Sequence, residues 1–286
     1  MSLLSQPRYE LVPLKSVERA IADLPDGSTT SITCSPVKGI ETTLDLAERV
    51  IGLGHRAVPH IAARMVTGPD HCRHIATRLQ NMGATELFLV AGDQDQPLGP
   101  YADGLSFLKD FLSTEHGLKT VGSTAYPDGH ALIDAHKISD ALHSKQELIL
   151  SAGLNSFVST QMCFDAAKTL RWLETERAAG LTVPVHLGLP GVVDRTKLLT
   201  LGARLGIGAS MRFLTKNRKS ITKLLTTSSY DPMELISPIE PRAASLGIES
   251  LHLFTFNEVG ATAKWITEAR SSAENRQVSG AKISIY

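Results

Sequence analysis

The sequence has no excess of charge of either sign, because 29 Lys and Arg residues balance 29 Asp and Glu residues and the formal net charge is +0. Proteins that bind nucleic acid or anionic membrane surfaces by long-range attraction carry a surplus of basic residues. The balance argues against both kinds of partner. It favours a small-molecule ligand.

Cysteine is scarce and long apolar runs are missing. The three cysteines, Cys34, Cys72 and Cys163, are widely separated and form no C-x-x-C pair, which is typical of reduced thiols and argues against a disulfide framework. No apolar run reaches the roughly 18 residues of a membrane span. The start, MSLLSQPRYE, lacks the basic and apolar regions of a signal peptide. We therefore expect a cytoplasmic protein without a membrane segment.

Short β-rich segments alternate with longer amphipathic stretches along the whole chain. Eight segments qualify as strands: RYELVPL, TTSITCSP, RAVPHIAA, ELFLVAGD, TVGSTAYP, FVSTQMCF, PVHLGLPG and SLHLFTFN. Four of the stretches between them end in Gly, as a helix C-cap does: TLDLAERVIGLG, DHCRHIATRLQNMG, LSFLKDFLSTEHG and AAKTLRWLETERAAG. Since a (β/α)8 barrel uses roughly 250 residues, we predict one α/β domain over residues 1–286, a (β/α)8 TIM barrel. A doubly wound open sheet is the alternative.

Two features of this barrel follow from the sequence. Strands buried on both faces should be near-continuous apolar runs, as in LFLV and LHLF. The interval from Thr196 to Gly247 should be a helical excursion before the last strand, with helices in KLLTLGARLG and MRFLTKNRKSITKLLT and a Pro-rich turn around ISPIEPR.

Polar residues recur near the C-terminal ends of the predicted strands, where active sites of such barrels gather. The set is Glu10, Thr33, His60, Asp93, Tyr126, Gln161 and Asn257. Any one of them could be a hydrogen-bonded structural group or a helix N-cap. Glu10 is the most unusual, because it lies between Tyr9 and Leu11, and a carboxylate removed from water costs several kcal/mol unless it is paired or protonated. It is therefore either exposed at a sheet edge or functional.

The order of the strand motifs resembles that of the methylenetetrahydrofolate reductases over nearly the whole chain. The motifs are YELVP, SITCSP, AVPHIAARM, VAGDQDQPLGPY, STAYPDGH, STQMCFD and LFTFN. The resemblance implies a (β/α)8 barrel enzyme that reduces 5,10-methylenetetrahydrofolate to 5-methyltetrahydrofolate with NADH or NADPH, usually through bound FAD. An FAD-dependent ping-pong enzyme and a folate-binding protein of the same fold without turnover are the alternatives.

The resemblance also assigns roles to individual residues. Glu10 falls on the family's general acid, which protonates N10 of the folate so that the methylene bridge can open; desolvation in an apolar strand would keep part of this carboxyl group protonated. Asp93 falls on an aspartate that contacts the pterin and stabilises the iminium ion, although it could also be a helix N-cap. Gln161 and Phe256 fall on substrate-binding positions. Residues at the flavin or nicotinamide face are Thr33, His60 and Tyr126.

The sequence departs from the family at the flavin positions. Ala91 stands where flavin-binding members carry arginine, and Leu148 and Ile149 stand where a basic pair holds the FAD diphosphate. Without these charge-assisted bonds the diphosphate loses its strongest anchors. The sequence therefore resembles the flavin-free members, in which NADH or NADPH passes hydride directly to the folate. FAD remains an alternative, because Lys145 and His143 could serve it.

Other positions leave questions open. Glu258 replaces an arginine that binds the folate tail in many members, and Arg195, Arg212 or Lys216 could take its place. The choice between NADH and NADPH, the direction of the reaction and the oligomeric state do not follow from the sequence.

Three further motifs do not predict a function. GLGHRA ends a helix and precedes a strand, the reverse of a dinucleotide-binding turn. HCRH places two histidines and a cysteine on one helix without a second ligand group, so no metal site is expected. KNRKSITK is typical of a solvated helix face.

Overall fold

The computed structural model describes residues 3–194 and 231–283 of the chain, and side chains as far as residue 273. Its strands are all parallel and close into one barrel in chain order. They are β1 (Arg8–Leu11), β2 (Thr29–Ile32), β3 (Arg56–Ala62), β4 (Glu86–Val90), β5 (Thr120–Ala125), β6 (Asn155–Thr160), β7 (Val185–Pro190) and β8 (Ile248–Phe254). The predicted (β/α)8 barrel is confirmed, and each of the eight strands overlaps its predicted segment.

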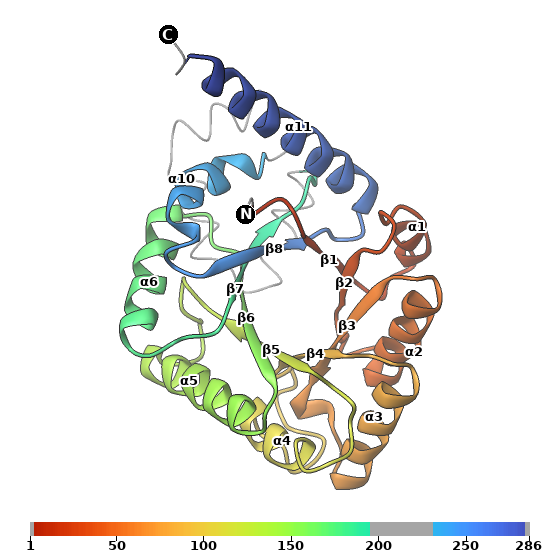
Figure 1. Ribbon diagram of the computed structural model, residues 1–286. Helices are drawn as coiled ribbons and strands as arrows, with labels where there is room; N and C mark the ends of the chain where they lie inside the picture. Colours follow the sequence, from red (N-terminus) through yellow and green to blue (C-terminus); the bar gives the residue numbers. More distant parts are fainter. Residues whose placement is uncertain (1–2, 195–230, 284–286) are drawn as a thin grey trace.

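The helices lie outside the ring of strands (Figure 1). They are α1 (Val17–Ala22), α2 (Gly39–Gly52), α3 (Pro69–Asn81), α4 (Gly104–Phe111), α5 (Ala135–Ser151), α6 (Ala166–Ala178), α10 (Met233–Ala243) and α11 (Val259–Ile283), with the short 3-10 helix η1 (Ala63–Met65) after β3. GLGHRA covers the end of α2 and the start of β3, so it is a helix end, as predicted. None of the described helices is long and apolar enough to be a membrane span.

The two faces of the strands differ in chemistry. Tyr9 and Leu11 of β1 belong to the large apolar cluster between strands and helices, whereas Glu10 between them faces the barrel interior, where it meets His252 of β8. The interior also holds aromatic and charged side chains in place of the bulky aliphatic layers usual in this fold. The expectation of apolar strands on both faces is therefore wrong for LHLF, where His252 faces the interior, but it holds for LFLV, whose Phe88 packs with Val58 and Phe157.

The predicted turn at ISPIEPR is also wrong, because these residues lie in α10, which contains Pro238 and Pro241. Proline inside a helix removes a hydrogen bond and disfavours the helical form. Here the helix nevertheless forms, and one of its faces is buried. The buried residues are Leu235, Ile236, Ile239 and Ala243. The predicted excursion up to residue 230, with Arg212, Lys216 and KNRKSITK, lies outside the described residues, and so does Arg195 before it.

The barrel closes at a seam between the two ends of the chain. The β1–β8 ladder pairs Arg8 with His252 and Tyr9 with Leu253. Asn257 extends the seam, because its side-chain amide accepts from Val12 N and donates to Val12 O, both at 2.9 Å. Its backbone is left-handed (φ 65°), a conformation that asparagine tolerates better than most residues. Asn257 thus holds the segment after β1 in place.

Candidate functional site

Glu10 is buried in the barrel interior, with 6% of its surface exposed, and it has a partner. His252 Nε2 lies 3.1 Å from its Oε2, and the hydroxyl of Thr255 donates to its backbone oxygen. The surroundings of the carboxyl group are therefore not the apolar ones expected from the sequence. The edge-exposed alternative for Glu10 is also ruled out.

The second ring nitrogen of His252 extends the contact, since Nδ1 lies 3.2 Å from Ser159 Oγ of β6. This chain of three groups satisfies its hydrogen bonds in two proton arrangements. With Glu10 ionised, His252 Nε2–H donates to the carboxylate and Ser159 donates to Nδ1. With Glu10 protonated, the carboxyl donates to Nε2 and Nδ1–H donates to Ser159. Glu10 can therefore release a proton without losing its partner.

His60 of β3 lies beside this pair and is almost entirely buried. Its ring centroid is 4.7 Å from that of Phe88 and 6.2 Å from that of His252. Burial, with a smaller contribution from His252, lowers the pKa of His60 well below its usual range, so the ring is neutral at pH 7. Its Nε2 has no hydrogen-bond partner, which costs about 1–3 kcal/mol in a folded protein. Such a group is a candidate for a ligand contact.

An ion pair occupies another part of the same interior. Arg8 Nη1 lies 2.7 Å from Glu86 Oε2 of β4, and the guanidinium lies 4.4 Å from the ring centroid of Phe157. Phe157 stacks on His186 of β7 at 4.3 Å. Burial is the main cause that lowers the pKa of both Arg8 and His186. Arg8 and Glu10 are alternate residues of one strand, so the ion pair fixes the strand that carries Glu10.

Asp93 and Tyr126 follow β4 and β5, on the side where the strands end. Asp93 is exposed and caps no described helix, since the N-cap of α4 is Asp103, whose carboxylate accepts from Ser106 N at 2.8 Å. The N-cap alternative for Asp93 is therefore wrong. Burial raises the pKa of Tyr126, and the charge of Asp93 contributes in the same direction. The charge of Asp93 therefore acts on Tyr126 at this end of the barrel.

The other predicted residues have structural contacts as well. Thr33 directly follows β2, and its backbone N–H donates to Leu11 O at 2.9 Å. Gln161 directly follows β6, and its Oε1 accepts from Met162 N at 2.9 Å, so its NH₂ group is the part that can donate elsewhere. Phe256 is buried after β8 and has a left-handed backbone (φ 49°). The set therefore divides into an inner group around Glu10 and His60 and an outer group at the strand ends.

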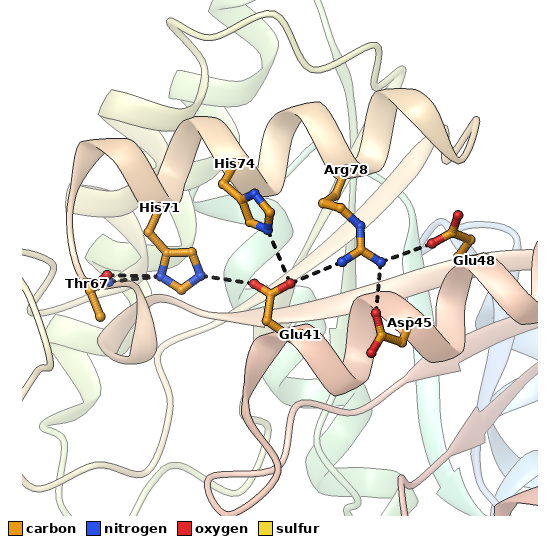
Figure 2. A network of polar contacts seen from close by, with 7 residues as sticks. All are labelled: Glu41, Asp45, Glu48, Thr67, His71, His74 and Arg78. Carbon is orange, nitrogen blue, oxygen red and sulfur yellow. Dashed lines mark hydrogen bonds and ion pairs between the residues drawn. The ribbon is translucent and has the colours of Figure 1, made fainter.

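The histidines of HCRH lie on the outer surface, away from the barrel interior (Figure 2). His71 and His74 of α3 approach Glu41 of α2, with nitrogen to oxygen distances of 3.5 and 3.3 Å. Arg78 also contacts Glu41 and bonds two further carboxylates of α2, Asp45 and Glu48. Because the guanidinium of Arg78 binds these carboxylates, the network is an ion-pair contact between α2 and α3.

Sequence reasoning missed His252 and Ser159. A signal was present in SLHLF, where Ser250, His252 and Phe254 alternate with Leu251 and Leu253. Such alternation places the polar set on the opposite face from the leucines. Interpreted as one apolar run, LHLF gives no indication of a partner for Glu10.

Comparison with known proteins places the chain by its fold. No protein-family model matches the sequence. One similar solved structure is an uncharacterized protein from Clostridium thermocellum that binds two copies of 5-methyl-5,6,7,8-tetrahydrofolic acid. It has a TM-score of 0.62 and 14% identity, and the match covers 93% of this chain and 95% of that one. Another is 2,3-dimethylmalate lyase, of the PEP mutase/isocitrate lyase superfamily, with a TM-score of 0.50 and 11% identity over 97% of this chain and 84% of that one. At these identities the likeness concerns the fold.

Proposed function

We propose that this protein binds a reduced folate at the barrel mouth and reduces 5,10-methylenetetrahydrofolate to 5-methyltetrahydrofolate with NADH or NADPH. The observation that carries the proposal is the buried carboxyl group of Glu10, held by His252 near the C-terminal end of β1. The order of the strand motifs supports it. So does the Clostridium thermocellum protein of similar fold, because the folate that it binds is the product of the proposed reaction.

The proposed chemistry gives Glu10 a defined task. N10 of the folate is a poor leaving group until it is protonated, so Glu10 transfers its proton to N10 as the bond from the methylene carbon to N10 breaks. The electron pair of N5 forms the iminium ion, and hydride from the nicotinamide adds to its carbon. The carboxylate left on Glu10 then accepts a hydrogen bond from His252, with Ser159 completing the chain.

The outer residues suit the binding of a cationic intermediate. Asp93 supplies a negative charge at the mouth, where the iminium ion develops. The amide of Gln161 offers a donor to the pterin edge. Thr33, Tyr126 and the inner His60 would face the nicotinamide, and Phe256 would contact the substrate.

Replacement of Asp93 by asparagine should slow hydride transfer by about 10²-fold, because preorganised charge at a developing cation is typically worth this much. Single-turnover measurement of NADH oxidation checks the prediction. Asp95→Asn is the matched control, since Asp95 is an exposed aspartate of the same loop. If the role of Asp93 were purely structural, the substitution would instead lower the thermal stability and leave the rate of hydride transfer unchanged.

The surroundings of the flavin positions favour direct hydride transfer. Ile149 is fully buried in an apolar cluster and Leu148 packs against the same cluster. His143 contacts Glu176 of α6 at 2.9 Å. Burial lowers the pKa of Lys145 to about 8, with Asp103 of α4 opposing the shift. The two residues considered for FAD thus interact with neighbouring helices, which supports a flavin-free enzyme.

We therefore expect the protein to purify without colour, and added FAD should not increase NADH-dependent reduction of methylenetetrahydrofolate. Nicotinamide and pterin must then bind together, so initial-rate plots should show intersecting lines of a ternary complex. The absorption spectrum and a two-substrate rate matrix check this. Stoichiometric FAD with parallel lines would identify the FAD-dependent ping-pong alternative.

A second candidate function is folate binding without turnover. The observation that favours it is that the Clostridium thermocellum protein is known for its bound folate. One pair of measurements separates the two: titration with 5-methyltetrahydrofolate, and NADH oxidation in the presence of methylenetetrahydrofolate. Binding together with oxidation of NADH or NADPH supports the reductase, whereas binding without oxidation of either nucleotide identifies the carrier.

A further inference from the structure

The inner group of the site contains a set of metal ligands that the sequence did not bring together. Glu10 of β1, His60 of β3 and His252 of β8 each offer one ligand atom, and these atoms all lie within 4.8 Å of one another. All three residues are buried. Among the described residues this is the one group of three or more such side chains with that spacing.

The spacing of these ligand atoms is close to the spacing of ligand atoms around a bound cation. Ligand atoms at 2.0–2.2 Å from a tetrahedral zinc ion are about 3.4 Å apart, and the contact between His252 Nε2 and Glu10 Oε2 is already 3.1 Å. The third ligand, a ring nitrogen of His60, lies within 4.8 Å of the other two ligand atoms, so it must approach them by at most about 1.4 Å to complete such a face.

Two further observations on the histidines fit a metal centre. A histidine ligand usually donates its second ring N–H to a polar group that fixes the ring, and His252 Nδ1 lies 3.2 Å from Ser159 Oγ. His60 Nε2, in turn, is buried without a hydrogen-bond partner. The first contact would orient one ligand. The unpartnered Nε2 of His60 is a nitrogen atom that could bind a cation.

We propose that Glu10, His60 and His252 bind one divalent transition-metal cation, with Zn²⁺ as the best match to two imidazoles and one carboxylate. This ligand set leaves coordination positions for water or an anionic ligand, and it disfavours Mg²⁺ and Ca²⁺, which prefer oxygen. The site goes beyond the proposed reductase. A bound cation would keep Glu10 ionised, so metal binding and proton delivery to N10 would exclude each other.

The test uses the full-length protein after dialysis against a chelator, with neither folate nor nucleotide present. Co²⁺ is the spectroscopic probe, because its visible bands report four- or five-coordination, and Zn²⁺ binding is measured by calorimetry after prolonged equilibration. We expect one equivalent of Co²⁺, displaced by Zn²⁺. Because no substrate is present, the result does not depend on whether the protein is a reductase.

Variants locate the cation. His60→Gln and His252→Gln should each weaken Zn²⁺ binding by more than the 10–100-fold typical of losing an outer partner. The control is the double variant His71→Gln/His74→Gln, which removes the surface pair beside Glu41 (Figure 2) and should bind as the wild type does. These two residues lie on an outer helix, so the control does not depend on how the barrel interior tolerates substitution.

Two results would overturn the proposal. If the wild-type protein takes up neither Co²⁺ nor Zn²⁺, the cluster holds a proton alone. If the surface double variant loses binding while His60→Gln retains it, the cation belongs to the surface network.

Discussion

Glu10→Gln should abolish most turnover of methylenetetrahydrofolate while leaving folate affinity nearly unchanged. The amide keeps the shape of the side chain and can still donate to or accept from His252 at the same position. It cannot deliver a proton to N10, so the loss should be about 10²- to 10⁴-fold and should appear in kcat. Steady-state rates with a separate titration of 5-methyltetrahydrofolate distinguish the two effects.

The matched control is Glu249→Gln. Glu249 lies on β8, as His252 does, but is exposed, so its loss should leave kcat unchanged. A Glu10→Gln protein with wild-type kcat would remove Glu10 from the mechanism. A variant that lost folate affinity and kcat together would indicate a binding role instead of proton transfer.

Arg8→Met should destabilise the barrel by about 3–5 kcal/mol, which is the usual cost of breaking a buried ion pair from one side. The side chains of Arg8 and Glu86 are 14% and 17% exposed, so the variant would leave Glu86 largely buried without its partner. The stacking of the guanidinium on Phe157 would be lost as well. Urea unfolding followed by circular dichroism measures the difference.

The double variant Arg8→Met/Glu86→Met separates the pair from the packing around it. Removing both charges should recover much of the lost stability, because apolar side chains can replace a buried ion pair at little cost. Arg242→Met is the surface control. Its pair with Glu174 is about half exposed, and we expect a loss of at most about 1 kcal/mol. Equal losses in the Arg8 and Arg242 variants would contradict the role given to the interior pair.

Much of the fold could be predicted because its signals are local. Each strand is a short β-rich segment, four of the helical stretches between the strands end in glycine, and eight β-then-α units in this length are typical of a barrel. The helix α10 could not be predicted in this way, since Pro238 and Pro241 argue locally for a turn. Burial of Ile236 and Ile239 against the barrel decides its conformation, and that contact depends on the folded chain.

The candidate site was predicted less completely. Glu10 could be singled out because a carboxylate between apolar residues is unusual in any strand. Its partner could not be found locally, because His252 lies 242 residues away and meets Glu10 only when the barrel closes. Asn257 shows the opposite case: its position after β8 suggested a ligand, whereas its amide is used by the backbone of Val12.

The seam between β1 and β8 also bears on how the protein folds. Bringing together segments from opposite ends of a chain has the largest loop-closure entropy, and such contacts slow folding. Intermediates that contain only part of the barrel are common for chains of this size, and any that lack β8 would have Glu10 without His252. The chemistry of the interior therefore cannot exist in a partly assembled barrel. During synthesis on the ribosome, β1 leaves the ribosome long before β8, so the contact between Glu10 and His252 forms only after β8 has been made.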